Sequence, residues 1–209
     1  MAAIREAAPE DVDAVTRLMY LAGKSNVEKS IYDIMWPQSM DLRMGRLAAL
    51  YKASARSWYR YDCYLVSESD GKVAGSLCGY NELESGDLKV RDAFIEVGVD
   101  REEWQIMLQA LQPYYRVRPD HPEDAWIIEH VAVFPEFRGR GLILDLLEKI
   151  LERGRERGYK LAQLDMLIGN APAQRAYEKA GFKASDQRED PEFATLFGAP
   201  GMLKMSTPL

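Results

Sequence analysis

The sequence predicts an α/β fold in which helices flank a twisted sheet. Its central stretch has a buried-strand pattern at 126–134, a glycine turn, an amphipathic helix at 142–158 and a second strand pattern at 160–168. This connection is long enough to be a crossover, so the two strands should be parallel. Residues 61–80 instead contain two strand patterns joined by Asp70-Gly71, which is typical of an antiparallel hairpin.

Composition narrows the class of protein further. The 209 residues are 47% hydrophobic and 29% charged, which suits one globular domain over residues 1–209. The net charge of −6 argues against nucleic acid as a general partner. No apolar run approaches the length of a membrane span and no signal-peptide pattern opens the sequence, so we expect a cytoplasmic protein without a membrane partner. Cys63 and Cys78 fit buried free thiols better than a disulfide.

The first third of the chain has recognisable start and stop signals. A short strand at 2–6 precedes a helix that begins near Pro9, and Gly23 is a plausible stop. A short helix is expected at 31–35, because Trp36-Pro37 disfavours its continuation. A further helix should cover 39–57. Several large side chains in this part fit a core better than a pocket: Tyr32, Trp36, Met40 and Met44.

The middle of the chain has fewer signals. We expect a loop over 81–99, with an additional strand at 93–99 as an alternative. Asp100 and Glu103 form a capping-box-like start of a helix that ends near Pro113. A polar loop follows at 119–124.

The C-terminal part resumes a regular pattern. The expected elements are a helix at 170–180 with Gly181 past its end, a strand starting at 182–185, a loop at 186–200 with a short helix near 192–197, and a last strand at 201–207.

The turn after the central strand is a candidate anion site. Arg138-Gly139-Arg140-Gly141 leads directly into the helix that begins at Leu142. Backbone N–H groups and the positive end of the helix dipole then converge, which suits a phosphate or pyrophosphate. The spacing does not match the dinucleotide fingerprint, because Leu144 stands where the third glycine would be, nor does it match a triphosphate loop. A plain strand-to-helix turn with solvated arginines remains the alternative.

Two motifs resemble the GNAT family of N-acyltransferases. The segment FRGRGL after VAVFPE is similar to the family's acyl-CoA loop, with Arg138 and Gly141 in their expected places and Ile143 where the family usually has Gly or Ala. The segment 170–182, NAPAQRAYEKAGF, is similar to the second signature, with Asn170 at its start and Gly-Phe at its end. Together the motifs cover about the C-terminal third of the chain.

The resemblance implies a mixed, mostly antiparallel sheet of about seven strands, with a central parallel pair splayed at a cofactor cleft. It implies an acyl-CoA-binding core at 126–183 and acceptor-side elements at 24–60 and 81–125. The cosubstrate would be acetyl-CoA. Its pantetheine would pair with the strand edge of Val131, Ala132 and Val133. Its pyrophosphate would meet the loop formed by Arg138, Gly139, Arg140, Gly141, Leu142 and Ile143, and its pantetheine would also contact Asn170, next to Ala173 and Tyr177.

Catalytic roles follow from the same resemblance and from residue chemistry. Tyr177 falls on the family's tyrosine and is the candidate general acid, with plain helix packing as the alternative. Glu129 is the candidate general base, because a carboxylate in an apolar strand has a raised pKa if it is buried. Strict alternation places Glu129 and His130 on opposite faces, although a bulge would change this. His130 and Asp165 are the second and third candidates for the base.

The sequence leaves several alternatives open. We expect an N-acetyltransferase that acts on a primary amine of a small molecule or peptide by direct attack in a ternary complex. A non-catalytic acyl-CoA-binding sensor or scaffold would keep the loop and Asn170 without needing Tyr177 or Glu129. A different phosphate-ligand protein is a third reading. We expect no metal, because the two histidines and two cysteines do not cluster in the sequence. A homodimer is compatible with the sequence, which does not set the oligomeric state.

Overall fold

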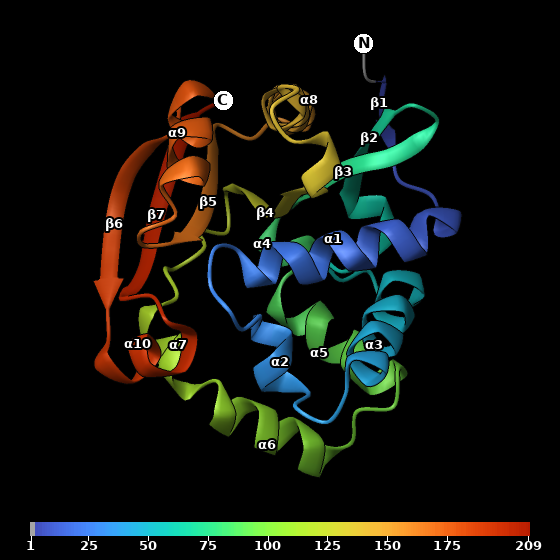
Figure 1. The fold of residues 1–209 in the computed structure, drawn as a ribbon, viewed down its shortest axis with the longest axis vertical. Helices are drawn as coiled ribbons and strands as arrows, with labels where there is room; N and C mark the ends of the chain where they lie inside the picture. Colours follow the sequence, from blue (N-terminus) through green and yellow to red (C-terminus); the bar gives the residue numbers. More distant parts are fainter. Residues whose placement is uncertain (1–2) are drawn as a thin grey trace.

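Helices cover both faces of one twisted sheet in this computed structural model, which describes residues 3–209 (Figure 1). Ala2, which we expected in the first strand, lies outside the described residues. The sheet has seven strands in the order β1-β2-β3-β4-β5-β7-β6. The strands are β1 (Ala3–Glu6), β2 (Tyr64–Ser69), β3 (Lys72–Tyr80), β4 (Trp126–Val133), β5 (Leu161–Leu167), β6 (Lys183–Glu189) and β7 (Gly201–Pro208).

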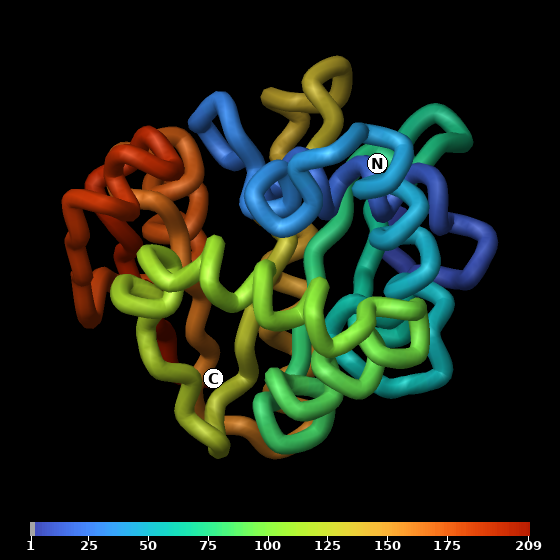
Figure 2. The backbone as a smooth tube through the Cα atoms, turned by 90° about the horizontal axis from the view of Figure 1, so that it is seen from below, coloured from blue at the N-terminus to red at the C-terminus, as the bar shows by residue number. Residues whose placement is uncertain are grey.

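Ten α-helices accompany the sheet within the described residues. They are α1 (Val12–Lys24), α2 (Ile31–Met35), α3 (Met40–Lys52), α4 (Glu82–Ser85), α5 (Asp87–Glu96), α6 (Arg101–Ala110), α7 (Gln112–Val117), α8 (Leu142–Glu156), α9 (Ala171–Lys179) and α10 (Pro191–Phe197). Seen from below, the segment from α5 to α7 crosses in front of the sheet, from the half that contains β1 to β4 to the half that contains β5 to β7 (Figure 2).

The central strands pair as the sequence predicts. β4 and β5 are parallel and every other neighbouring pair is antiparallel. The β4–β5 pairing covers three residues on each strand, 126–128 on β4 and 162–164 on β5. Beyond Ile128 the two strands separate, so the rest of β4 presents an edge towards β5. The mixed, mostly antiparallel sheet with a splayed parallel pair is confirmed.

A β-bulge interrupts β4 where this separation begins. Ala132 pairs with Ser76 and Glu129 pairs with Cys78, so two residues of β4 stand opposite Leu77 of β3. One of the two is His130, whose φ of 55° is unusual for a residue with a side chain. The extra residue turns His130 to the same face as Glu129. Strict alternation, which would place the two side chains on opposite faces, is therefore wrong. The bulge that we considered as the alternative is present.

Each face of the sheet has its own apolar cluster. Trp126 and Ile128 pack with the α8 stripe, and the Trp126 indole donates to the Ile150 carbonyl at 3.1 Å. Ile127 faces the other side, where α1, α2 and α3 contribute Val15, Met19, Tyr32, Leu47 and Leu50. Since both faces of β4 are covered, its near-continuous apolar run is explained.

Residues 81–99 fold differently from our expectation. They form α4 and α5, so the loop with an additional strand is wrong. The spacing of Val90, Ala93 and Phe94 is helical, and Ala93 and Phe94 are buried on one side of α5. Asn81 caps α4 by accepting from the Leu83 N–H at 3.1 Å.

Three other boundaries also differ. The helix expected to end near Pro113 ends at Ala110, and Pro113 lies in the first turn of a further helix, α7, where a missing N–H costs nothing. The helix expected over 39–57 ends at Lys52, because the Glu96 carboxylate accepts from the N–H groups of Ser54 and Ala55 at 2.7 and 2.9 Å. β6 extends to Glu189, into the segment where we expected a loop. Its polar, mostly exposed residues pair with β7, and they lack the apolar alternation by which a strand is recognised in a sequence.

Two smaller expectations can be compared with the structure. Cys63 and Cys78 are both free thiols; Cys78 is buried, as predicted, whereas Cys63 is half-buried. Among residues 3–209 no helix combines the length and apolar character needed to cross a membrane.

Gly79 offers a test of the packing between β3 and α8. A Cβ at this position would lie 2.6 Å from Ile150 Cδ1 and 2.8 Å from Trp126 Cζ2. We expect Gly79→Ala to lower the free energy of unfolding by about 1–3 kcal/mol, as overpacking does. In the control Gly45→Ala, the added Cβ meets no atom within 4 Å and lies in exposed α3. That change should raise stability by about 0.5–1 kcal/mol. Urea denaturation measures both, and equal midpoints would contradict the packing described.

Candidate active site

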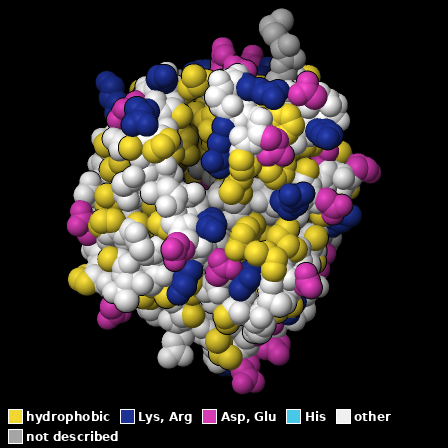
Figure 3. Space-filling model, in the orientation of Figure 1, with side chains coloured by type: hydrophobic (Ala, Val, Ile, Leu, Met, Phe, Trp, Pro, Cys, Tyr) yellow, Lys and Arg dark blue, Asp and Glu magenta, His cyan; other side chains and the backbone are white. Residues whose placement is uncertain are grey.

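A cleft of about 780 Å³ opens where β4 and β5 separate. Its walls come from both halves of the sheet and from the helices in front of them. One end lies against the loop before α8 and against α9, and the other extends to α2, α5, α6 and α7. The surface is hollowed between the two halves of the molecule, and hydrophobic side chains surround the hollow (Figure 3).

The glycine loop before α8 presents free backbone donors. Gly139 and Gly141 have φ of 78° and 81°, which glycine adopts without strain. Among residues 3–209, no oxygen accepts a hydrogen bond from the N–H groups of residues 139–143. The Arg138 N–H, in contrast, is bound to the Pro135 carbonyl at 3.2 Å. These five N–H groups, at the positive end of a 15-residue helix, are suited to an anion, as the sequence analysis predicts.

The side chains of this loop point in different directions. Ile143 is partly buried and packs against the apolar clusters, and it also lines the cleft. Arg138 lines the cleft. Arg140 does not line it: its guanidinium lies 3.1 Å from Asp70 on the β2–β3 turn and stacks over Phe137. Of the two arginines in this loop, Arg138 brings its positive charge to the cleft.

The exposed edge of β4 forms the floor of the cleft beside this loop. Val131, Ala132 and Val133 all line the cavity, and β5 does not pair with any of them. Their backbones are thus available to an extended ligand that adds itself as a strand.

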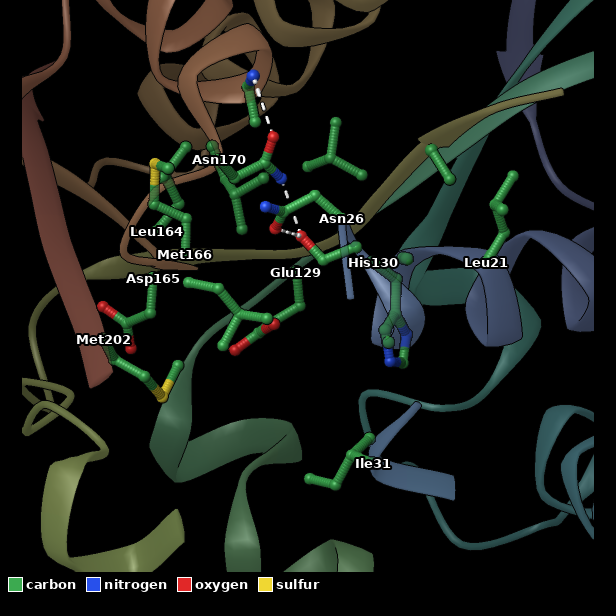
Figure 4. A pocket seen from close by; sticks show the side chains of 18 of the residues that line it. Leu21, Asn26, Ile31, Glu129, His130, Leu164, Asp165, Met166, Asn170 and Met202 are labelled. Atoms are coloured by element: carbon green, nitrogen blue, oxygen red, sulfur yellow. Dashed lines mark hydrogen bonds between the residues drawn. The ribbon is translucent and has the colours of Figure 1, made fainter. Parts of the chain in front are cut away.

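The second sequence motif forms the opposite wall. Asn170 caps α9 by accepting from the Ala173 N–H at 3.4 Å, and its amide donates to Ser25 Oγ at 2.7 Å (Figure 4). Ala173 and Tyr177 follow one turn and two turns later on the same helix face and line the cleft. Tyr177 is buried, and burial together with the Glu129 charge raises the pKa of its phenol well above the usual range. The phenol therefore keeps its proton at neutral pH.

Glu129 projects from β4 into the centre of the cleft (Figure 4). Its carboxylate forms no hydrogen bond or ion pair with any of residues 3–209. Burial raises the pKa of Glu129 to about 7; the positive charges of His121 and Arg118 oppose this shift, and Asp165 adds to it. A carboxylate with this pKa, free of partners and open to a ligand, can accept a proton near neutral pH.

His121 is a part of the site that sequence reasoning missed. It lies in the loop that we expected to be merely polar, yet 3% of its side chain is exposed. Its Nε2 is 2.8 Å from Asp165 and its Nδ1 is 3.5 Å from Glu82. Although burial alone would lower it, these two carboxylates raise the pKa of His121 to about 9. The sequence contained one signal of this pair: Asp165 lies in an apolar strand, where a carboxylate needs a partner.

One potential metal-binding group exists in the cleft. The ligand atoms of His121, Glu129 and Asp165 lie within 4.8 Å of one another. We expected no metal because histidines and cysteines are scattered along the sequence, and that reasoning did not consider one histidine joined by two carboxylates. His121 and Asp165 already bind each other, so a buried ion pair is enough to explain why these two side chains lie together.

His130 has a structural environment. Tyr32 Oη lies 2.6 Å from its Nε2 and Tyr64 Oη lies 2.5 Å from its Nδ1. Burial lowers the pKa of His130 to about 3, so the ring is neutral. Both nitrogens are engaged, which leaves no atom to take a proton from a ligand. Of the three candidates for the base, Glu129 has the free carboxylate.

Comparison with known proteins agrees with this geometry. A sequence model described as the Acetyltransferase (GNAT) family matches residues 28–182. No curated protein matches the chain. Similar solved structures include an acetyltransferase (24% identity, TM-score 0.70, covering 99% of this chain and 98% of that one) and an N-acetyltransferase from Staphylococcus aureus Mu50 (23%, 0.71, all of both chains). Rv2747 from Mycobacterium tuberculosis, in complex with CoA and NLQ, is also similar (16%, 0.54, 99% of both chains).

These structures are below 25% identity and show the shared fold, whereas the family match extends over most of the chain and includes both motifs and the edge of β4. The chain therefore belongs to the GNAT acetyltransferase family and is an acyl-CoA-dependent acetyltransferase.

Proposed function

We propose that this enzyme transfers the acetyl group of acetyl-CoA to a primary amine of a small molecule or peptide, by direct attack in a ternary complex. One observation carries the proposal: an open strand edge, a loop of free backbone donors and an unpartnered carboxylate line the same cleft. The donors suit a pyrophosphate, the edge suits the two amides of pantetheine, and the carboxylate suits an amine. The solved complex of Rv2747 with CoA adds support for a CoA donor on this fold.

The parts of the chain divide between the two substrates. In this proposal residues 126–183 of the single domain hold acetyl-CoA, with pantetheine along 131–133 and next to Asn170 and Ala173. The acceptor occupies the other half of the cleft, formed by α2 and by α5 to α7, within the acceptor-side segments 24–60 and 81–125.

Each step then has a group to carry it. Glu129 takes a proton from the bound ammonium, and the neutral amine attacks the thioester carbonyl carbon. A backbone N–H at the bulge, near Val131, polarises the carbonyl oxygen. The C–S bond breaks as the C–N bond forms, and Tyr177 gives its proton to the departing thiolate. The nitrogen of the new amide then loses its second proton to the Tyr177 phenolate, and Glu129 releases the first proton to solvent. The products are the N-acetyl amide and free CoA.

The basic test measures binding and turnover separately. Calorimetry should detect CoA binding, and a thiol-detecting reagent should record release of CoA from acetyl-CoA when primary amines are added. If CoA binds and no amine in a broad panel gives turnover, the non-catalytic binding module is the better description. If neither CoA nor acetyl-CoA binds, the proposal fails at its first step.

Tyr177→Phe tests the general acid. The phenyl ring preserves the buried packing and removes the proton, so we expect kcat to fall about 10²–10⁴-fold while CoA affinity stays unchanged. Tyr159→Phe is the matched control, because Tyr159 Oη contacts Glu84 outside the cleft. Full activity in Tyr177→Phe would assign this side chain to packing alone.

The pH profile tests the general base. Glu129 accepts a proton only when it is ionised, so kcat should fall below pH about 7, tenfold per unit, and level off above it. Glu129→Gln should lower kcat about 10²–10⁴-fold and abolish this inflection, leaving the titration of the acceptor amine itself. An unchanged inflection in Glu129→Gln would show that a different group is the base.

A further inference from the structure

Aromatic side chains form both walls of the acceptor half of the cleft. On the β4 side, Tyr59, Phe94 and Trp104 contact one another edge to face, with ring centroids 5.8 and 5.4 Å apart. On the β5 side, Phe197 lies 6.3 Å from Tyr114 and stacks on Phe193 at 4.4 Å. All of these residues line the cavity. The walls are braced by their own contacts, so they offer a preformed apolar slot.

Charge is concentrated at the floor of this slot. Figure 4 shows Glu129 and Asp165 directed into the space between the strands, with Met202 on one side and Ile31 on the other. Asp165 is already paired with His121 at 2.8 Å, whereas Glu129 has no partner among residues 3–209. A single ammonium is therefore attracted to Glu129.

The other charged side chains that line this half of the cleft have partners of opposite charge within residues 3–209. Arg118 lies 2.9 Å from Asp87, towards the open side. The other basic residues that line the cavity, Arg138, Arg175 and Lys179, are on the α8 loop and on α9 at the opposite end. A second positive charge on the acceptor, several bonds from the first, would enter the aromatic slot without an unpaired carboxylate to meet it. Leaving a charge buried and unpaired is costly.

From this arrangement we infer that the acceptor is a monocationic primary amine with an apolar or aromatic body, such as an alkylamine or arylalkylamine, and neither a polyamine nor a peptide with a charged side chain beside the amine. This inference deepens the proposed function and rests on it. The ammonium lies at Glu129, and the body lies between the aromatic walls.

Two amines with the same six-carbon chain test the inference. We expect the kcat/KM of n-hexylamine to exceed that of 1,6-diaminohexane on the order of 100-fold at saturating acetyl-CoA, because the two differ only in the second ammonium. 2-Phenylethylamine should match or exceed n-hexylamine. An equal or higher kcat/KM for the diamine would overturn the inference and leave the proposed function intact.

A failure of the proposed function gives a different result. If no amine of the broad panel is acetylated, the proposed reaction is wrong, and calorimetric titration of both amines into the CoA-saturated protein then tests the inference by binding. If other amines are acetylated and these two are not, the inference is overturned and the proposed function stands. Tighter binding of n-hexylamine would support the apolar slot, and equal or tighter binding of the diamine would reject it.

A variant pair locates the slot. Leu108 is half-buried on α6 and lines the cavity, so Leu108→Glu supplies a carboxylate for the distal ammonium. We expect this change to raise the preference for the diamine over n-hexylamine at least about tenfold. Ile106→Glu makes the same charge change on α6, where the side chain is 60% exposed and outside the cavity, and should leave the ratio at its parent value. An unchanged ratio in a folded, CoA-binding Leu108→Glu protein would overturn this placement.

Discussion

The β4 bulge, held by two tyrosines on one neutral histidine, is the constraint on which the site depends. His130 adopts a left-handed backbone conformation, which costs free energy and persists only where its surroundings hold it in place. Tyr32 comes from α2 and Tyr64 from β2, so the bulge is fixed from a helix and from a neighbouring strand at once. The hydrogen bonds to both ring nitrogens fix the orientation of the imidazole, and burial lowers its pKa to about 3, so the ring stays neutral. The extra residue interrupts the regular pairing of β4 with β3 near the point where β5 departs from β4. The open edge, the position of Glu129 and the start of the cleft therefore share one cause.

Electrostatics divides the cleft into two ends. The α8 loop contributes free N–H groups and Arg138, which favour a polyanion. The floor carries Glu129, whose raised pKa of about 7 reflects burial more than any single neighbour. His121, positively charged between Asp165 and Glu82, holds those carboxylates in place and leaves Glu129 as the group without a partner. A polyanion and a cation are thus directed to opposite ends of one cavity, and the edge of β4 runs between them.

The sequence was sufficient for the parts whose pattern is local. The βαβ unit, the glycine loop and the N-cap Asn170 follow from period changes and residue types within about forty positions. It was insufficient where the cause is distant. The Tyr32–His130 and Tyr64–His130 hydrogen bonds join residues that are 98 and 66 positions apart, and no local sequence pattern predicts them. His121 finds Asp165 44 positions away in the same manner. The missed helix α5 is different, because Val90, Ala93 and Phe94 already had helical spacing, and the charged residues between them obscured it.

The hydrogen bond between Asn170 and Ser25 has a consequence for how the cleft is held together. It ties the start of α9 to the turn after α1, so a single contact joins two walls of the cleft. Ser25 is held there with φ of 51° and ψ of −116°, a strained conformation for a serine. The Asn170 amide nitrogen carries a second hydrogen, so a ligand can accept from it while the contact with Ser25 stays in place. Ser25, at the start of the acceptor-side segment 24–60, is thereby linked to the helix that the proposed function places beside the acyl donor.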